Sequence, residues 1–363
     1  MGKKLKIMHV LNSGDYSGAE SVVITIIENY GKNVQGIYVG LKGEIGKFLE
    51  AAKIKYYPVS KLNLKNLKIA VKEIKPDIIH AHDFRASCLT AMLMTESPIL
   101  SHLHSNPLWI RRICPCSVAY FMLSFRFQKI LTVSASVMQE YCFGKQLENK
   151  VIITGNPADT AKIRRLADKE PAGMYRKQEF DVAFLGRLVP EKNPHLFLKI
   201  IHKLKKMKPD IRAVMIGDGE MRRAIENEIC RRDMKETIQM TGFLKNPYPV
   251  LKQAKVLCMP SSCEGFGLAA IEALSVGKPV VCSAQGGLKD IVTKKCGLVC
   301  QSEKDYTDEI FRLLTSQEYY SQKSFEAEKR SQLFDNIPEY MQKLVQTYSQ
   351  VLSSTSRDYR TVC

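Results

Sequence analysis

Short apolar segments alternate with amphipathic segments along almost the whole chain. The apolar segments are rich in β-branched residues, which is typical of buried strands. In the first half of the chain they read KIMHVL, GIYVGL, DIIHAH, ILSHLH and KILTVSA. The segments between them, such as 18–30 and 44–52, have the apolar spacing of helices. This order predicts an α/β fold with a parallel, doubly wound sheet.

A second series of the same kind occupies the other half, with strand candidates FDVAFLG, RAVMIGDG, TIQMTGF, VLCMPS, KPVVCS and GLVC. A polar stretch with two prolines, 156–178, separates the two series and predicts a junction. We therefore expect Rossmann-like domains at 1–162 and 163–336. The remaining segment, 337–363, is expected to hold a helix that packs back toward the first domain and then a loose tail. Two such sheets place their ligand-binding strand ends opposite one another, which predicts a central cleft.

Length and composition favour a globular protein of two domains, since 363 residues exceed one ordinary domain and 45% are hydrophobic. No apolar run approaches the roughly 20 residues that span a bilayer. The N-terminal KIMHVL reads as a strand and is too short for a secretion signal, so we expect a cytoplasmic protein. The 11 cysteines are mostly scattered singly, which predicts reduced thiols. Because they lack zinc-ligand spacing, no metal is expected.

The formal net charge of +17 is shared by both halves and predicts a polyanionic partner. Nucleic acid would rest on charge alone, without a stacking platform, and is not expected. The segment 106–130 mixes Trp109, Arg111 and Arg112 with an apolar run. Two interpretations stay open for it. It is either a buried helix beside the first sheet or a peripheral contact with the anionic inner face of the cell membrane.

The stretch SSCEGFGLAAIEALSVGKPVV holds the clearest candidate chemistry. Gly265 and Gly267 allow a ligand close to the backbone, and the start of the next helix favours an anion such as a diphosphate. Glu264 is placed to accept hydrogen bonds from hydroxyls beside that anion. Glu272, about two turns into the helix, would reach another part of one elongated ligand. Two ordinary surface glutamates explain this spacing poorly, because Glu272 has apolar neighbours and burying an unpartnered carboxylate is costly.

A basic loop in FLGRLVPEKNPH is the second candidate. Arg187 follows a strand directly and is able to bind a phosphate through two parallel hydrogen bonds. Lys192 precedes the next helix and adds a compact positive charge. A solvated basic loop explains this segment equally well when it is considered alone.

Taken together, these motifs resemble a known family. The segment from Glu264 to Glu272 resembles the E-x7-E motif of retaining glycosyltransferases of family 4, which have the two-domain GT-B fold. Arg187 and Lys192 resemble that family's pair on the donor diphosphate, and IGDGEMRRAIE and MTGF resemble further parts of its donor domain. The resemblance extends from about residue 5 to about residue 350.

The resemblance implies a role for each matching residue. Glu272 would bind the ribose of the nucleotide and Glu264 the transferred sugar. The donor would also contact the backbone of the turn and the loops after two earlier strands, at Gly265, Phe266, Gly267, Leu268, Gly242 and Gly18. Gly18 lies in GDYSGAE, which has Ser17 where the family usually has a glycine. SHLHS would offer a histidine to the sugar, with His104 the first choice and His102 the competitor.

The family implies a retaining, metal-independent hexosyltransferase without a cofactor, in which His104, Glu264, Arg187 and Lys192 are the catalytic candidates. We expect a nucleotide-sugar donor, UDP-linked first and GDP-mannose second. The expected acceptor is a saccharide or a polyprenyl-linked lipid in surface polysaccharide or glycolipid synthesis. Two alternatives share the fold, a non-hydrolysing sugar-nucleotide epimerase and a non-catalytic partner subunit. The E-x7-E pattern disfavours the first, and the intact basic pair and glutamates disfavour the second.

Overall fold

The computed structural model describes residues 4–170 and 178–354. Contacts between Cα atoms divide the chain into two compact units, Met1–Pro157 with Ile337–Cys363, and Ala158–Asn336. The domain boundaries expected from the sequence stay predictions. Residues 171–177 of the expected junction and 355–363 of the expected tail lie outside the described residues.

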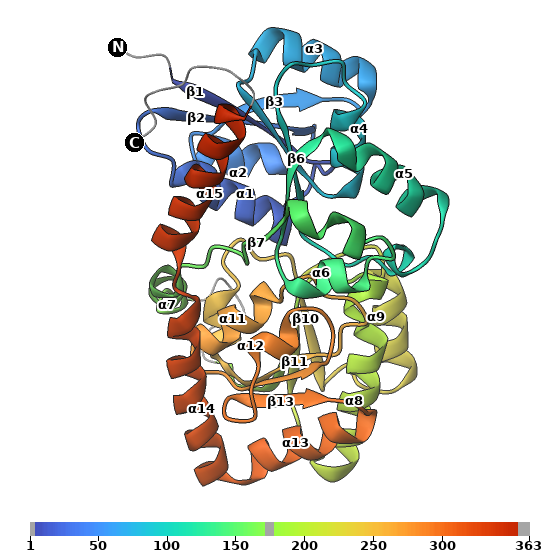
Figure 1. Cartoon of the computed structure of the whole chain (residues 1–363). Helices are drawn as coiled ribbons and strands as arrows, with labels where there is room; N and C mark the ends of the chain where they lie inside the picture. The colour runs from blue at the N-terminus through green and yellow to red at the C-terminus, as the bar shows by residue number, and fades with distance from the viewer. Residues whose placement is uncertain (1–3, 171–177, 355–363) are drawn as a thin grey trace. The chain divides into compact units, whose positions relative to one another are not determined.

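The first unit is built on a parallel sheet of seven strands in the order β3-β2-β1-β4-β5-β6-β7. Figure 1 labels β1, β2, β3, β6 and β7 of this sheet. The strands are β1 (Leu5–Val10), β2 (Val34–Leu41), β3 (Lys55–Val59), β4 (Ile78–His82), β5 (Ile99–Leu103), β6 (Phe127–Thr132) and β7 (Val151–Ile153). Five of them are the segments expected from the sequence. The sequence pattern missed the two edge strands, because β3 is largely solvent-facing and contains a proline, and β7 has only three residues.

The helices of this unit are α1 (Gly18–Glu28), α2 (Ile45–Ala51), α3 (Leu64–Ile74), α4 (Phe84–Ala91), α5 (Pro115–Leu123), α6 (Ala135–Glu140) and α15 (Ile337–Ser353). Local sequence fixes several of their starts. Asn63 and Asp83 accept hydrogen bonds from backbone amides in the first turns of α3 and α4. The last helix, α15, buries Tyr340, Leu344 and Tyr348, which share one face. Among the described residues, no helix combines the length and apolar character needed to cross a bilayer.

The second unit has a parallel sheet of six strands in the order β10-β9-β8-β11-β12-β13. Its strands are β8 (Phe180–Leu185), β9 (Ala213–Ile216), β10 (Ile238–Gly242), β11 (Ala254–Met259), β12 (Val280–Ser283) and β13 (Gly297–Cys300). Its helices are α7 (Thr160–Ala167), α8 (Pro194–Met207), α9 (Arg222–Arg231), α10 (Tyr248–Lys252), α11 (Leu268–Ser275), α12 (Leu288–Ile291), α13 (Glu303–Thr315) and α14 (Gln317–Ser331).

Helices cover both faces of this second sheet. Alternate residues of β8 belong to different cores, Ala183 to one and Val182 and Phe184 to the other. The first core also contains residues of α7, α10, α11, α12 and α14, and the second contains residues of α8, α9 and α13. Both units are therefore doubly wound α/β structures, as the sequence predicted.

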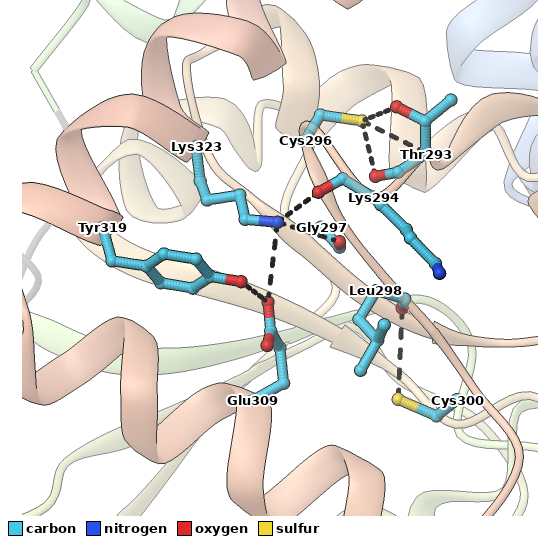
Figure 2. Close-up of polar contacts among 9 residues, drawn as sticks. All are labelled: Thr293, Lys294, Cys296, Gly297, Leu298, Cys300, Glu309, Tyr319 and Lys323. Carbon is cyan, nitrogen blue, oxygen red and sulfur yellow. Dashed lines mark hydrogen bonds and ion pairs between the residues drawn. The ribbon is translucent and has the colours of Figure 1, made fainter.

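A buried lysine links α13 and α14 to the loop before β13 (Figure 2). The ammonium of Lys323 donates hydrogen bonds to the carbonyl oxygens of Lys294 and Gly297. It lies 3.9 Å from the carboxylate of Glu309, which also accepts a 2.9 Å hydrogen bond from Tyr319. Burial lowers the pKa of Lys323. The cation is accommodated because these oxygens replace its water shell.

The strand orders identify where ligands should bind. In each sheet the order reverses once, between β1 and β4 in the first unit and between β8 and β11 in the second. Ligands of such sheets occupy the crevice beyond the carboxyl ends of the strands at these points.

Candidate functional site

In the second unit, the loops after β8 and β11 bring two sequence-predicted residues into contact at the switch point. The Lys192 ammonium lies 2.6 Å from a carboxylate oxygen of Glu264, and the two side chains are 23% and 10% exposed. Ser261 donates to the same oxygen at 3.2 Å. The backbone amide of Ser262 donates to the carbonyl of Glu191 at 2.8 Å and joins the two loops. The site therefore holds a preformed, largely dehydrated pair of opposite charges.

The turn between Glu264 and α11 depends on glycines. Gly267, with φ of 107°, precedes the first residue of α11 and contributes no side chain that would cap the helix. A Cβ on Gly286 would lie 1.6 Å from the carbonyl oxygen of Glu264, and one on Gly287 would lie 2.6 Å from that of Phe266. The turn thus rests directly on a second Gly-rich loop. The first amides of α11, which no side chain caps, form a surface suited to an anion.

Glu272 lies in the second turn of α11, nearer the start of the helix than the two turns expected from the sequence. One carboxylate oxygen accepts a 3.1 Å hydrogen bond from the hydroxyl of Tyr248. Burial raises the pKa of Glu272, while this hydrogen bond and the charge of Lys192 oppose the rise. Among the residues that the structure describes, no hydrogen-bond donor contacts the second oxygen of Glu272, which leaves that oxygen to accept hydrogen bonds from a ligand.

Arg187 and Gly242 border the same end of the sheet. Arg187 is exposed directly after β8, and the amide of Leu188 donates a 2.9 Å hydrogen bond to the carbonyl of Asp218 after β9. Gly242 ends β10 with φ of 70°, and its carbonyl accepts a 3.0 Å hydrogen bond from the amide of Gly217. The loops after β8, β9 and β10 are therefore joined through their backbones.

The remaining two candidates belong to the first unit. Gly18 is the first residue of α1 and follows Ser17, whose hydroxyl donates to Glu20. His104 lies just beyond the end of β5, whereas its competitor His102 lies inside the strand and is fully buried. Among the described residues, Nδ1 of His104 and Nε2 of His102 have no hydrogen-bond partner.

His104 belongs to a group of five histidines, of which the sequence indicated only His104 and His102 as candidates. His9, His80, His82 and His102 are its other members, from β1, β4 and β5. Burial lowers the pKa of His9 and that of His104 to about 3. For the other three, burial acts first and neighbouring histidines lower the pKa further. The signal was present in DIIHAH and SHLH, because residues two apart on a strand share one face.

Two subsets of these histidines bring three ring nitrogens close together. Nitrogen atoms of His9, His80 and His82 lie within 4.8 Å of one another, and so do those of His82, His102 and His104. Neutral imidazoles of this kind are suitable ligands for zinc, copper or nickel.

Comparison with known proteins finds one family model that matches the second unit. Residues 167–330 match the model of the family described as glycosyl transferases group 1. An uncharacterized glycosyltransferase of Methanocaldococcus jannaschii is 26% identical over 269 residues, which are 66% of this chain and 65% of that protein. A GalNAc-α-(1→4)-GalNAc-α-(1→3)-diNAcBac-PP-undecaprenol α-1,4-N-acetyl-D-galactosaminyltransferase of Campylobacter jejuni is 27% identical over 232 residues, 62% of this chain and 61% of that protein. The match thus spans less than two thirds of either relative.

A solved structure, Anabaena HepE in complex with UDP-glucose, matches the fold over nearly the whole chain. Its TM-score is 0.81 at 19% identity, and the match covers 95% of this chain and 100% of HepE. At this identity the likeness concerns the fold.

Proposed function

The chain belongs to the group 1 glycosyltransferases and has their GT-B fold, and from this premise we propose that it moves a sugar from a nucleoside diphosphate to an acceptor with retention at the anomeric carbon. The observation that carries the proposal is the contact between Lys192 and Glu264 at the switch point, beside the uncapped start of α11. A cation, a carboxylate and the amides at the start of a helix are groups that suit a sugar diphosphate.

The charges of the reaction match these groups. As the glycosidic bond breaks, positive charge develops on the anomeric carbon and negative charge on the departing diphosphate. Lys192, Arg187 and the first amides of α11 would stabilise the diphosphate, which is the electrostatic contribution expected to dominate. Lys192 would exchange Glu264 for a phosphate oxygen when the donor binds. Glu264 would then be released to accept hydrogen bonds from the sugar, and the acceptor's proton would pass to the departing phosphate.

The donor is proposed to be a UDP-sugar, with GDP-mannose as the second choice. The complex of HepE with UDP-glucose supports this choice through the shared fold. Glu272 would bind the ribose with the carboxylate oxygen that Tyr248 leaves available. For the acceptor we propose a saccharide or a polyprenyl-linked saccharide, in keeping with the undecaprenol-linked substrate in the name of the Campylobacter relative.

Calorimetric titration with UDP, GDP and ADP in the presence of EDTA tests the donor site. Wild type should bind UDP, and Glu272→Gln should weaken binding about 10- to 150-fold, because a hydrogen bond to a charged group contributes about 1.5–3 kcal/mol. Glu318→Gln, which changes an exposed glutamate of α14, is the matched control. The proposal fails if none of the nucleotides binds, or if Glu272→Gln binds UDP as tightly as wild type does.

We further propose that the segment 106–130 contacts an anionic membrane surface. Four of its apolar side chains are exposed by more than half, namely Leu108 (56%), Ile113 (77%), Met122 (64%) and Phe125 (72%). The exposed Arg111 and Arg112 lie beside them in the sequence. Basic and apolar side chains in this combination suit the headgroup region of a bilayer.

Sedimentation with vesicles tests this contact. Wild type should bind vesicles containing phosphatidylglycerol more than vesicles of phosphatidylcholine alone. A variant with Met122→Ser and Phe125→Ser should lose most of this binding. The control Phe325→Ser removes an aromatic that is 67% exposed on α14 of the other unit. Equal binding by all three proteins would contradict the proposal.

A further inference from the structure

Five histidines and two tyrosines of the first unit form one unbranched chain of hydrogen bonds. In order, it runs through His104, His82, His9, Tyr30, Tyr348, His80 and His102. The six contacts measure 2.9, 2.9, 2.9, 2.9, 2.8 and 3.2 Å in this order. Of the ring nitrogens and hydroxyl oxygens in these seven residues, only Nδ1 of His104 and Nε2 of His102 have no partner among the described residues. These two atoms are the ends of the hydrogen-bond chain.

The hydrogen-bond chain follows from the pairing of the strands. In the register of β1 and β4, His9 pairs with His80, and in that of β4 and β5, His82 pairs with His102. These side chains stack on one face of the sheet, with ring centroids 4.2 Å apart for His80 and His82. Tyr30, just after α1, and Tyr348 of α15 close the chain. It crosses the switch point between β1 and β4, where a ligand of this sheet is expected.

The number of N–H and O–H hydrogens restricts this hydrogen-bond chain to two arrangements of donors and acceptors. Each neutral histidine carries one N–H and each tyrosine one O–H, so seven groups supply seven hydrogens for six bonds. The seventh hydrogen then lies on the free nitrogen at one end. In all six bonds the direction from donor to acceptor along the hydrogen-bond chain is therefore the same. A tyrosine hydrogen turned out of the chain would be the exception, but it would leave a buried hydroxyl without an acceptor, which is unfavourable.

The ring nitrogens that form these hydrogen bonds give all five histidines the same tautomer. Each interior histidine uses Nδ1 toward one neighbour and Nε2 toward the other. If the bonds point from His102 toward His104, all five carry their hydrogen on Nδ1. If they point the other way, all five carry it on Nε2.

We propose that this chain fixes one common tautomer for all five histidines and thereby sets whether Nδ1 of His104 is a donor or an acceptor. His82 is the positioning residue that contacts His104 directly, and Tyr30 and Tyr348 are positioning residues that act through the chain. The role of His104 toward a sugar rests on the proposed function, whereas the common tautomer does not.

A metal ion would be incompatible with this chain. Coordination takes the lone pair of a ring nitrogen, and every nitrogen except the two at the ends already takes part in a hydrogen bond. The lowered pKa values of the histidines also fit neutral rings, with one hydrogen in each hydrogen bond. Retention of stoichiometric zinc, copper or nickel through purification, and its loss in His102→Gln, would overturn the proposal.

Nitrogen NMR of the full chain labelled with 15N-histidine tests the proposal. Only seven histidines contribute signals, and His195 and His202 of the second unit serve as references. Long-range 1H–15N correlation distinguishes an Nδ1–H ring from an Nε2–H ring. We expect five neutral histidines with one shared tautomer. A mixture of tautomers among the five, or a charged member at neutral pH, would overturn the proposal.

Two tyrosine variants make the test directional. In Tyr348→Phe, the hydroxyl of Tyr30 has only His9 left as acceptor, so His9, His82 and His104 should all become Nδ1–H. In Tyr30→Phe, Tyr348 donates to Nδ1 of His80, so His80 and His102 should become Nε2–H. Whichever tautomer the wild type has, one of the two variants must change the tautomer of the histidines named for it. The other variant must leave the tautomer of its histidines unchanged.

Tyr340→Phe is the matched control, because it removes a buried hydroxyl from the same helix without touching the chain. Unchanged thermal unfolding and amide spectra would show that the variants fold. If neither Tyr348→Phe nor Tyr30→Phe alters a histidine tautomer, the chain does not act as a unit. These spectra need no nucleotide, so their failure is separate from a failure of the donor site.

Discussion

Acidification should destabilise the first unit steeply, because its five inward-facing histidines stay neutral in the folded state. Burial lowers the pKa of His9 and of His104 to about 3, and it lowers the pKa of the other three as well. In the unfolded chain each histidine titrates near its ordinary pKa of about 6.5. Below that value the unfolded state binds more protons, so stability falls as the pH falls.

The expected loss can be calculated for each histidine. Between about pH 7.5 and about pH 5.5, a histidine that is protonated only when unfolded costs about 1.4 kcal/mol. Five of them together cost about 7 kcal/mol, which is comparable to the whole stability of many domains. Asp83 works in the opposite direction, since burial raises its pKa to about 6. The protonation of Asp83 in the folded state raises the free energy of unfolding by only about 1 kcal/mol over the same pH interval.

Urea unfolding at the two pH values measures this loss. The sequence has one tryptophan, Trp109, which lies in the first unit against Phe84. Its fluorescence therefore reports the unfolding of the unit that contains the histidines. His102→Gln should reduce the pH dependence by about one histidine's share, about 1.4 kcal/mol. His202→Gln, in the second unit, should leave the Trp109 transition unchanged.

A loss of less than about 2 kcal/mol between the two pH values would refute the reasoning. It would mean that these histidines take up protons inside the fold, so that their folded and unfolded pKa values are nearly equal.

Three further predictions concern the second unit. Lys192→Met should lower its stability by about 1–3 kcal/mol in urea unfolding, because the carboxylate of Glu264 loses its cation in a poorly solvated position. Gly286→Ala should weaken nucleotide binding in calorimetry, because its Cβ would lie 1.6 Å from the carbonyl oxygen of Glu264 and displace the turn. Lys323→Met should cost about 3–5 kcal/mol, measured by urea unfolding, because it leaves Glu309 buried without a cation.

Each of these variants has a control. Lys203→Met removes a half-exposed lysine of the same unit and should change stability by less than about 1 kcal/mol. Gly31→Ala adds a Cβ that meets no atom within 4 Å and should bind nucleotide normally. Adding Glu309→Gln to Lys323→Met should recover part of the stability. Equal effects of a variant and its control would contradict the reason given for that variant.

Most of the architecture could be predicted from local patterns. Buried parallel strands produce short apolar runs, and Gly-rich turns mark their carboxyl ends, so both sheets and the loops around Glu264 were accessible from the sequence. The edge strands β3 and β7 were missed because an edge strand needs neither length nor a continuous apolar run. The ligand roles of the candidate residues stay predictions.

Contacts between distant residues could not be predicted in this way. Lys192 and Glu264 were each expected to face a ligand, and only the fold shows that they meet across 72 positions. The hydrogen-bonded chain of histidines is a stronger case. It depends on the register of three strands and on the hydroxyl of Tyr348, which lies 268 positions from His80. A residue's own neighbours in sequence contain no information about such a partner.

The position of α15 in the chain has a consequence for biosynthesis. The first unit takes its last helix from Ile337–Ser353, after the whole of the second unit has been translated. Until that helix leaves the ribosome, His80 lacks the hydroxyl of Tyr348 and the inner face of the first sheet lacks part of its cover. The second unit, by contrast, is continuous in sequence, from Ala158 to Asn336. Translation from the N-terminus usually completes the first domain first. Here the unit that begins first is the one completed last, and the part of its sheet that α15 will cover is the surface that a ribosome-associated chaperone would need to protect.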